Sequence, residues 1–185
     1  MVSTNSLKNG MTLSIDGELW RVDYFQHVKP GKGGAFVRTT LKGVQNGKTI
    51  DRTFRAGENL DQAILTKRAL QYLYRDGADF VFMDTEHFEQ TNVPESALRG
   101  NAQWVREGDT IELVFHGDTV VDLNLPSSVE LVVTATEPGI QGDRVSGATK
   151  PATLETGATI NVPLFINVGE RLKVETRTGA YLSRA

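Results

Sequence analysis

The 185-residue chain contains no cysteine, which excludes disulfide bonds and thiolate metal sites. It also lacks any run of the roughly 20 apolar residues that a membrane span needs. Its first ten residues, MVSTNSLKNG, do not resemble a signal peptide. Hydrophobic residues make up 39% and charged residues 23% of the chain, as is usual for folded globular proteins. We therefore expect a cytoplasmic protein that has no contact with membranes.

Histidine is scarce, and its three positions, His27, His87 and His116, stand too far apart for the close pairing typical of metal ligands. The carboxylates within residues 84–89 flank a turn among polar residues, which is typical of a solvated acidic face. No cluster of side chains matches a nucleophile and its base. The sequence therefore predicts no metal, no cofactor and no enzymatic activity.

The charge is unevenly distributed along the chain. Residues 1–63 hold nine basic and six acidic residues, residues 64–127 hold five and eleven, and residues 128–185 hold six of each. Solvated strands could account for the basic excess of the first third, and so could a face that binds a polyanion. Residues 27–55 hold seven basic residues against Asp51 alone, and these are Lys29, Lys32, Arg38, Lys42, Lys48, Arg52 and Arg55.

Alternation of apolar and polar residues dominates the first third, where it predicts an antiparallel unit of at least four strands. Asp16-Gly17 and Asn46-Gly47 lie between these segments and favour tight hairpin turns. Residues 56–65 loosen the pattern and predict a linker or a helical turn. The expected strands are Met11–Ile15, Glu18–Val28, Ala35–Val44 and Thr49–Arg55.

The rest of the chain repeats this organisation, with one short helix expected at residues 94–105 and a turn-rich stretch at residues 137–150. Short strands with glycine turns predict an all-β fold of three small barrels, which we place at residues 1–63, 64–127 and 128–185. Residues 177–184 close the chain. The further expected strands are Gln71–Tyr74, Phe80–Asp84, Thr110–Phe115, Thr119–Leu123, Val129–Ala135, Ala158–Asn161, Leu164–Asn167 and Arg171–Glu175.

The segment KPGKGGAF, residues 29–36, carries Lys32 between glycines. It is neither a phosphate-binding loop, because no Ser or Thr follows the lysine and no helix follows the loop, nor a dinucleotide fingerprint, because no βαβ context surrounds it. Gly31, Gly33 and Gly34 let the backbone approach a partner, and Lys32 projects a compact cation that suits RNA phosphates or covalent modification. A solubilising hairpin loop is the alternative.

Three stretches of the chain together resemble bacterial elongation factor P. They are residues 27–36 (HVKPGKGGAF), residues 71–84 (QYLYRDGADFVFMD) and residues 142–169, and the similarity continues in order over the whole length. The last stretch has a spacing that is similar to the signature of that family. Its matching residues are Lys150, Ala152, Gly157, Val162, Pro163 and Gly169.

The resemblance implies an SH3-like (KOW-type) barrel followed by two OB-fold barrels in an elongated L shape. It implies a monomeric translation factor that binds the 70S ribosome beside peptidyl-tRNA in the P site and promotes peptide-bond formation at consecutive prolines. The loop Lys29, Pro30, Gly31, Lys32, Gly33 and Gly34 would meet the CCA end of the tRNA, and a lysine-modifying enzyme could act on Lys32. Arg38, Lys42, Arg52 and Arg55 would contact the tRNA backbone.

A second contact implied by the resemblance is the loop of Gly142, Asp143, Arg144 and Gly147, which would reach the mRNA codon in the E site. Arg144 stands where relatives commonly have threonine, so the codon contact does not carry over directly. A plain surface loop is the alternative. An elongation-factor-P-like paralogue and an OB-fold RNA-binding protein acting off the ribosome are the alternative functions.

Overall fold

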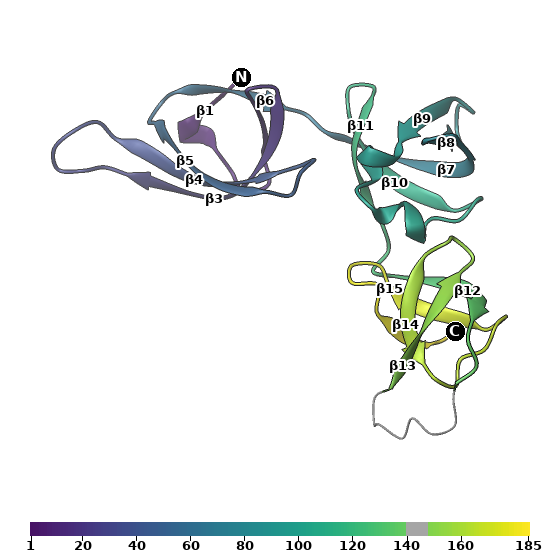
Figure 1. Cartoon of the computed structure of the whole chain (residues 1–185). Coiled ribbons are helices and arrows are strands. Elements are labelled where there is room, and N and C mark those ends of the chain that lie inside the picture. The colour runs from purple at the N-terminus through teal and green to yellow at the C-terminus, as the bar shows by residue number, and fades with distance from the viewer. Residues whose placement is uncertain (140–147) are drawn as a thin grey trace. The chain divides into compact units, whose positions relative to one another are not determined.

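The structure, a computed structural model, describes residues 1–139 and 148–185. Its described residues form sixteen β-strands and three short 3-10 helices, so the predicted all-β class is confirmed (Figure 1). The chain divides into two compact units, one of residues 1–68 and 113–122 and the other of residues 69–112 and 123–185. No helix of the described residues is long and apolar enough to cross a membrane.

The first sheet has the strand order β1-β6-β2-β3-β4-β5. Its core is a cluster that includes Leu13, Trp20, Val22, Val37 and Leu41, all supplied by alternate positions of the strands. The strands are β1 (Val2–Ser3), β2 (Thr12–Ile15), β3 (Glu18–Val28), β4 (Phe36–Gly43), β5 (Thr49–Arg55) and β6 (Asn59–Ala63).

The tight turn between β2 and β3 has the expected geometry, because Asp16 and Gly17 both adopt positive φ, of 53° and 79°. The segment of residues 56–65, which we expected to be a linker or a helical turn, instead contains β6. This strand pairs with β1 and β2, segments about fifty residues earlier in the chain, so its local sequence carries little sign of it.

The second sheet has the strand order β11-β10-β7-β8-β9. If these five strands are numbered one to five along the chain, the order is 5-4-1-2-3, as in an OB-fold barrel. Its strands are β7 (Thr66–Asp76), β8 (Asp79–Asp84), β9 (Gln90–Pro94), β10 (Thr110–His116) and β11 (Thr119–Asn124). The helix expected at residues 94–105 is instead two 3-10 turns, η2 (Glu95–Leu98) and η3 (Asn101–Trp104). Positive φ values at Arg99 and Gly100 separate them.

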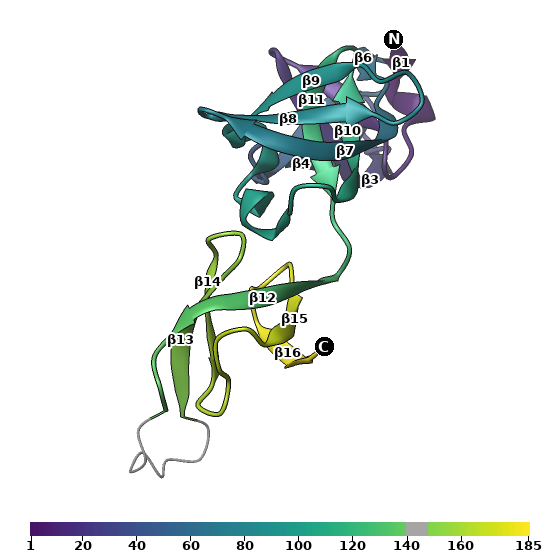
Figure 2. The ribbon, with the colours of Figure 1, turned by 90° about the vertical axis from the view of Figure 1, so that its right-hand side faces the viewer.

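The third sheet has the strand order β14-β13-β12-β15-β16. Its central strand, β12 (Ser128–Thr136), pairs with a different neighbour along each half of its length. Residues 128–132 pair with β15 (Arg171–Glu175) and residues 133–136 with β13 (Thr149–Leu154), with a register shift between Val133 and Ala135. Figure 2 shows β12 running from the side of β15 to the side of β13. The other two strands are β14 (Thr159–Pro163) and β16 (Tyr181–Arg184).

Two predictions for the last third were wrong, one of a strand and one of a turn-rich stretch. Residues 164–167 form a turn after β14 rather than a strand. Residues 149–150, which we assigned to the turn-rich stretch, begin β13, and the strand then continues through Pro151 to Leu154. The alternation is hard to see there because a lysine occupies a buried position and a proline follows it.

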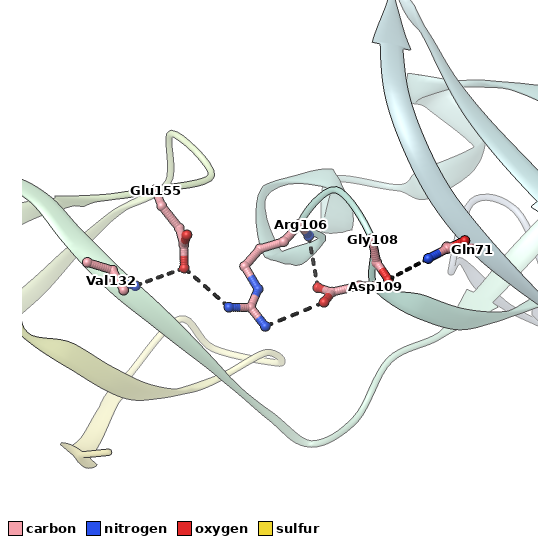
Figure 3. A network of polar contacts seen from close by, with 6 residues as sticks. All are labelled: Gln71, Arg106, Gly108, Asp109, Val132 and Glu155. Carbon is pink, nitrogen blue, oxygen red and sulfur yellow. Dashed lines mark hydrogen bonds and ion pairs between the residues drawn. The ribbon is translucent and has the colours of Figure 1, made fainter.

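Within the second unit, Trp104 of η3 packs into the hydrophobic cluster of the third sheet, beside residues such as Leu131 and Ile166. Nearby, Arg106 bridges two carboxylates, with its guanidinium 3.4 Å from Asp109 and 3.5 Å from Glu155 (Figure 3). Burial alone would lower the pKa of Arg106, but the two carboxylates outweigh it and the net pKa lies above the ordinary value. The two contacts join η3 and its following turn to the third sheet.

Candidate nucleic-acid interface

The loop of residues 29–35 closes the long hairpin of β3 and β4, whose last paired residues are Val28 and Phe36 (Figure 1). Lys29 and Lys32 are both exposed there. The hairpin carries the loop to the end of the first sheet that lies opposite β1 and β6 in Figure 1. The lysines are therefore presented to solvent on an extended support.

The three loop glycines do different things. Gly33 adopts a φ of 106°, a backbone conformation that other residues rarely take, whereas Gly31 and Gly34 have no positive φ. A Cβ atom added at Gly31 or Gly34 would meet no heavy atom within 4 Å. These two positions therefore leave free space around the backbone, as a loop that a partner approaches closely requires.

Three of the four arginines and lysines expected to contact a nucleic-acid backbone share one side of the first sheet. In β4 the residues Val37, Thr39 and Leu41 are buried, so Arg38 and Lys42 lie on the opposite, exposed side. Arg55 of β5 pairs with Phe36 and therefore lies on the same side as Arg38, because directly paired residues share a face. We call this exposed side of β3–β5, with Arg38, Lys42 and Arg55, the cation face.

Arg52 does not belong to the cation face. It pairs with Thr39, whose side chain points to the buried side of the sheet. Its guanidinium lies 3.6 Å from Asp16 and 5.5 Å from the ring centre of Phe54. Arg52 and the apolar Phe54 are two residues apart in β5, so their side chains lie on the same face of the strand. The sequence could therefore have indicated that Arg52 lies on the buried side of the sheet.

Sequence reasoning missed Tyr24, which lies in the middle of the cation face. Asp23 is an extra residue of a β-bulge, so that Val22 pairs with Leu41 but Tyr24 pairs with Thr40. The simple alternation of β3 would place Tyr24 on the buried side with Val22. A bulge of one residue leaves no clear signal in the sequence.

The predicted mRNA-side loop of Gly142, Asp143, Arg144 and Gly147 lies outside the described residues. The segments on either side of it are tightly held. Lys150 is only 6% exposed, and its ammonium group donates a hydrogen bond to the carbonyl oxygen of Glu137. The described residues contain no group of three or more His, Asp or Glu side chains that could hold a metal ion.

Three family models match consecutive parts of the chain. The Elongation factor P KOW-like domain matches residues 3–60, the Elongation factor P OB domain matches residues 65–123, and the model named Elongation factor P, C-terminal, matches residues 129–184. These matches agree with the predicted SH3-like and OB-type barrels. The chain is therefore similar to this family in all three of its sheets.

Curated relatives are similar over the full length. The chain is 59% identical to elongation factor P of Frankia casuarinae over 184 residues, which cover 100% of this chain and 98% of the relative. It is 58% identical to elongation factor P of Mycolicibacterium smegmatis with the same coverage of both chains. Among solved structures, the eukaryotic translation initiation factor 5A from Methanococcus jannaschii aligns with a TM-score of 0.52 at 23% identity, over 66% of this chain and 90% of that one. This last likeness shows a shared fold.

Proposed function

The chain belongs to the elongation factor P family and is a translation elongation factor, and from this premise we propose that it acts on ribosomes stalled at consecutive prolines. In this proposal it binds the 70S ribosome beside the peptidyl-tRNA of the P site. There it promotes formation of the next peptide bond. It does so as a binding protein, without donating a proton or a nucleophile.

The observation that carries the proposal is the exposed Lys32 at the closed end of the β3–β4 hairpin. The free space at Gly31 and Gly34 lets the loop backbone approach RNA, and the ammonium group of Lys32 supplies three donors for phosphate or hydroxyl oxygens. The loop would meet the CCA end of the tRNA. The cation face would follow the phosphates of the acceptor arm.

The proposed mechanism is positional. Proline is a secondary amine with a fixed φ, so that a badly placed nascent end reacts slowly with it. A protein that holds the CCA end in the reactive geometry removes part of the entropic barrier. A barrier lower by about 3–4 kcal/mol would accelerate the step by a factor of hundreds.

We predict that Lys32→Ala abolishes the acceleration of Pro-Pro-Pro synthesis in a reconstituted translation system, because the loop loses its only charge at the tip. Lys48→Ala is the matched control, since Lys48 is an exposed lysine of the same sheet in the turn between β4 and β5. That control should retain the wild-type rate, and both variants should keep the wild-type melting temperature.

Wild-type acceleration by Lys32→Ala would contradict the assignment of Lys32. Ribosome profiling of a strain without the protein tests the wider proposal, which requires new pauses at Pro-Pro codons. Unchanged occupancy at these codons would argue for one of the alternative functions. The intact mass of the native protein, with peptide mapping across residues 29–38, shows whether Lys32 carries an added group.

A further inference from the structure

We propose that Tyr24 is a stacking platform on which the cation face holds an unpaired RNA nucleotide. The inference rests on the proposed function, because it concerns the same face of β3–β5. It adds Tyr24 and base stacking to the contacts that arginine and lysine make with the phosphates of the RNA.

The exposure of Tyr24 is a consequence of the backbone. The side chain is 54% exposed, although the strand that carries it also supplies Trp20 and Val22 to the core. If Asp23 occupied a regular position in the strand, Tyr24 would have the same orientation as Val22 and point into the sheet's buried side. The bulge therefore moves a large aromatic ring from the core side to solvent, which costs hydrophobic burial.

Two cations flank the ring. Tyr24 pairs directly with Thr40, so that Arg38 and Lys42 are its diagonal neighbours on β4. Diagonal neighbours on a sheet lie about 7–8 Å apart, within reach of long side chains. No ion pair of the described residues involves Arg38 or Lys42, so no carboxylate neutralises either charge. The guanidinium of Arg38 lies 5.6 Å from the ring centre of Phe36, a contact that leaves its charge in place.

The carboxylates near the ring already have partners. Asp23 lies 2.9 Å from the Nε of Arg21, and Asp51 accepts a hydrogen bond of 2.9 Å from the hydroxyl of Thr40. The ion pair compensates the charge of Asp23, and the two cations beside the ring outnumber the remaining carboxylate of Asp51. The surroundings of Tyr24 therefore favour an anionic ligand.

An exposed ring between two cations matches the chemistry of single-stranded nucleic acid. The cations hold successive phosphates while the base between them lies on the ring. A base inside a paired stem is already stacked on its neighbours and cannot use the ring in this way. The ligand of Tyr24 in this inference is therefore an unpaired nucleotide. The test below distinguishes it from a paired stem.

The test measures binding of the full chain to two RNA hairpins with the same stem, one blunt and one with an unpaired 3′ tail. The wild-type protein should bind the tailed hairpin more tightly. Tyr24→Val should weaken binding to the tailed hairpin about tenfold and remove the preference for the tail, because stacking contributes on this scale per base. Valine keeps the strand propensity of the position.

Three variants make the result specific. Tyr74→Val is the matched control, because Tyr74 on β7 is also an exposed tyrosine, at 47%. It should bind both hairpins as the wild type does, and so should Tyr24→Phe, which keeps the ring. Tyr24→Trp should bind the tailed hairpin at least as tightly as the wild type, which tests the inference even if Tyr24→Val folds poorly.

Equal binding of the two hairpins by the wild type would overturn the inference, and so would full affinity of Tyr24→Val. If Tyr24→Phe loses as much affinity as Tyr24→Val, the hydroxyl group makes the contact and stacking is refuted. Equal losses of Tyr24→Val on the tailed and the blunt hairpin would instead place the contact on the paired stem and overturn the inference. These measurements need no ribosome and no peptide synthesis. If Lys32→Ala has no effect on Pro-Pro-Pro peptide synthesis, the RNA-binding result for Tyr24 is unaffected. Likewise, a negative result for Tyr24 does not contradict the proposed function of Lys32.

Discussion

At the scale of single residues, two glycines without positive φ differ sharply in what surrounds them. A Cβ atom at Gly139 would lie 2.6 Å from the backbone carbonyl oxygen of Leu164, closer than real Cβ atoms approach such an atom. A Cβ atom at Gly34 would meet nothing within 4 Å. The missing side chain of Gly139 thus lets its backbone lie close to that of Leu164. The hydrogen bond from Lys150 to the carbonyl oxygen of Glu137 holds the same segment two residues earlier.

We predict that Gly139→Ala lowers the free energy of unfolding by about 1–3 kcal/mol, because the added methyl group forces the backbone apart. Gly34→Ala should change it by less than about 1 kcal/mol, since the methyl group enters open space and reduces the entropy of the unfolded chain. Urea denaturation of both variants checks this. Equal stabilities would show that the segment around Gly139 adjusts without cost.

At the scale of elements, the 3-10 turn η3 contributes more to packing than its four residues suggest. Trp104 is buried among apolar side chains of the third sheet, and its ring lies 3.4 Å from where a Cβ of Gly179 would be. The hydroxyl of Thr156 donates a hydrogen bond to the carbonyl oxygen of Gln103 in the same turn. An apolar anchor and a polar contact thus hold η3 against the third sheet.

Trp104→Ala should lower the free energy of unfolding of the second unit by about 3–5 kcal/mol, as expected when a buried tryptophan is truncated. Arg106→Met should lower it by less than about 1 kcal/mol, because its ion pairs with Asp109 and Glu155 are partly solvated. Urea denaturation followed by circular dichroism compares the two variants. A larger loss for Arg106→Met than for Trp104→Ala would contradict this ranking.

The sequence predicted those elements whose alternation is uninterrupted, such as β4, and therefore also the position of the loop with Lys32 ahead of that strand. It did not predict β6, because the pairing that stabilises this strand comes from distant residues. It did not predict β13 either, because the buried Lys150 and the following Pro151 break the apolar pattern. The exposure of Tyr24 depends on a bulge, which is a property of the paired strands together.

At the scale of the whole molecule, the net charge of −3 conceals the basic first third and the acidic middle third. The basic side chains are further separated by the sheet, since Arg38 lies on the cation face and Arg52 lies on the other side. Binding to RNA should therefore depend on the local field of one face rather than on the net charge.

We predict that Arg38→Gln reduces the slope of log affinity for RNA against log salt concentration by about 0.7–0.9, the value of one lost phosphate contact. Arg52→Gln should leave the slope unchanged, because Arg52 is directed away from the cation face and toward Asp16. Titrations of one RNA hairpin at several salt concentrations provide both slopes. Equal losses for the two variants would indicate nonspecific attraction to the whole first third.

The sharing of β12 between β13 and β15 also determines how the third sheet opens. When β12 detaches, β13 and β15 both lose a neighbour in the ladder, although they follow different segments of the chain. Their amide protons then become exchangeable with solvent deuterium through the same event. We therefore expect the two halves of this barrel to exchange as a single cooperative unit in native-state hydrogen exchange, with β12 setting the free energy of opening.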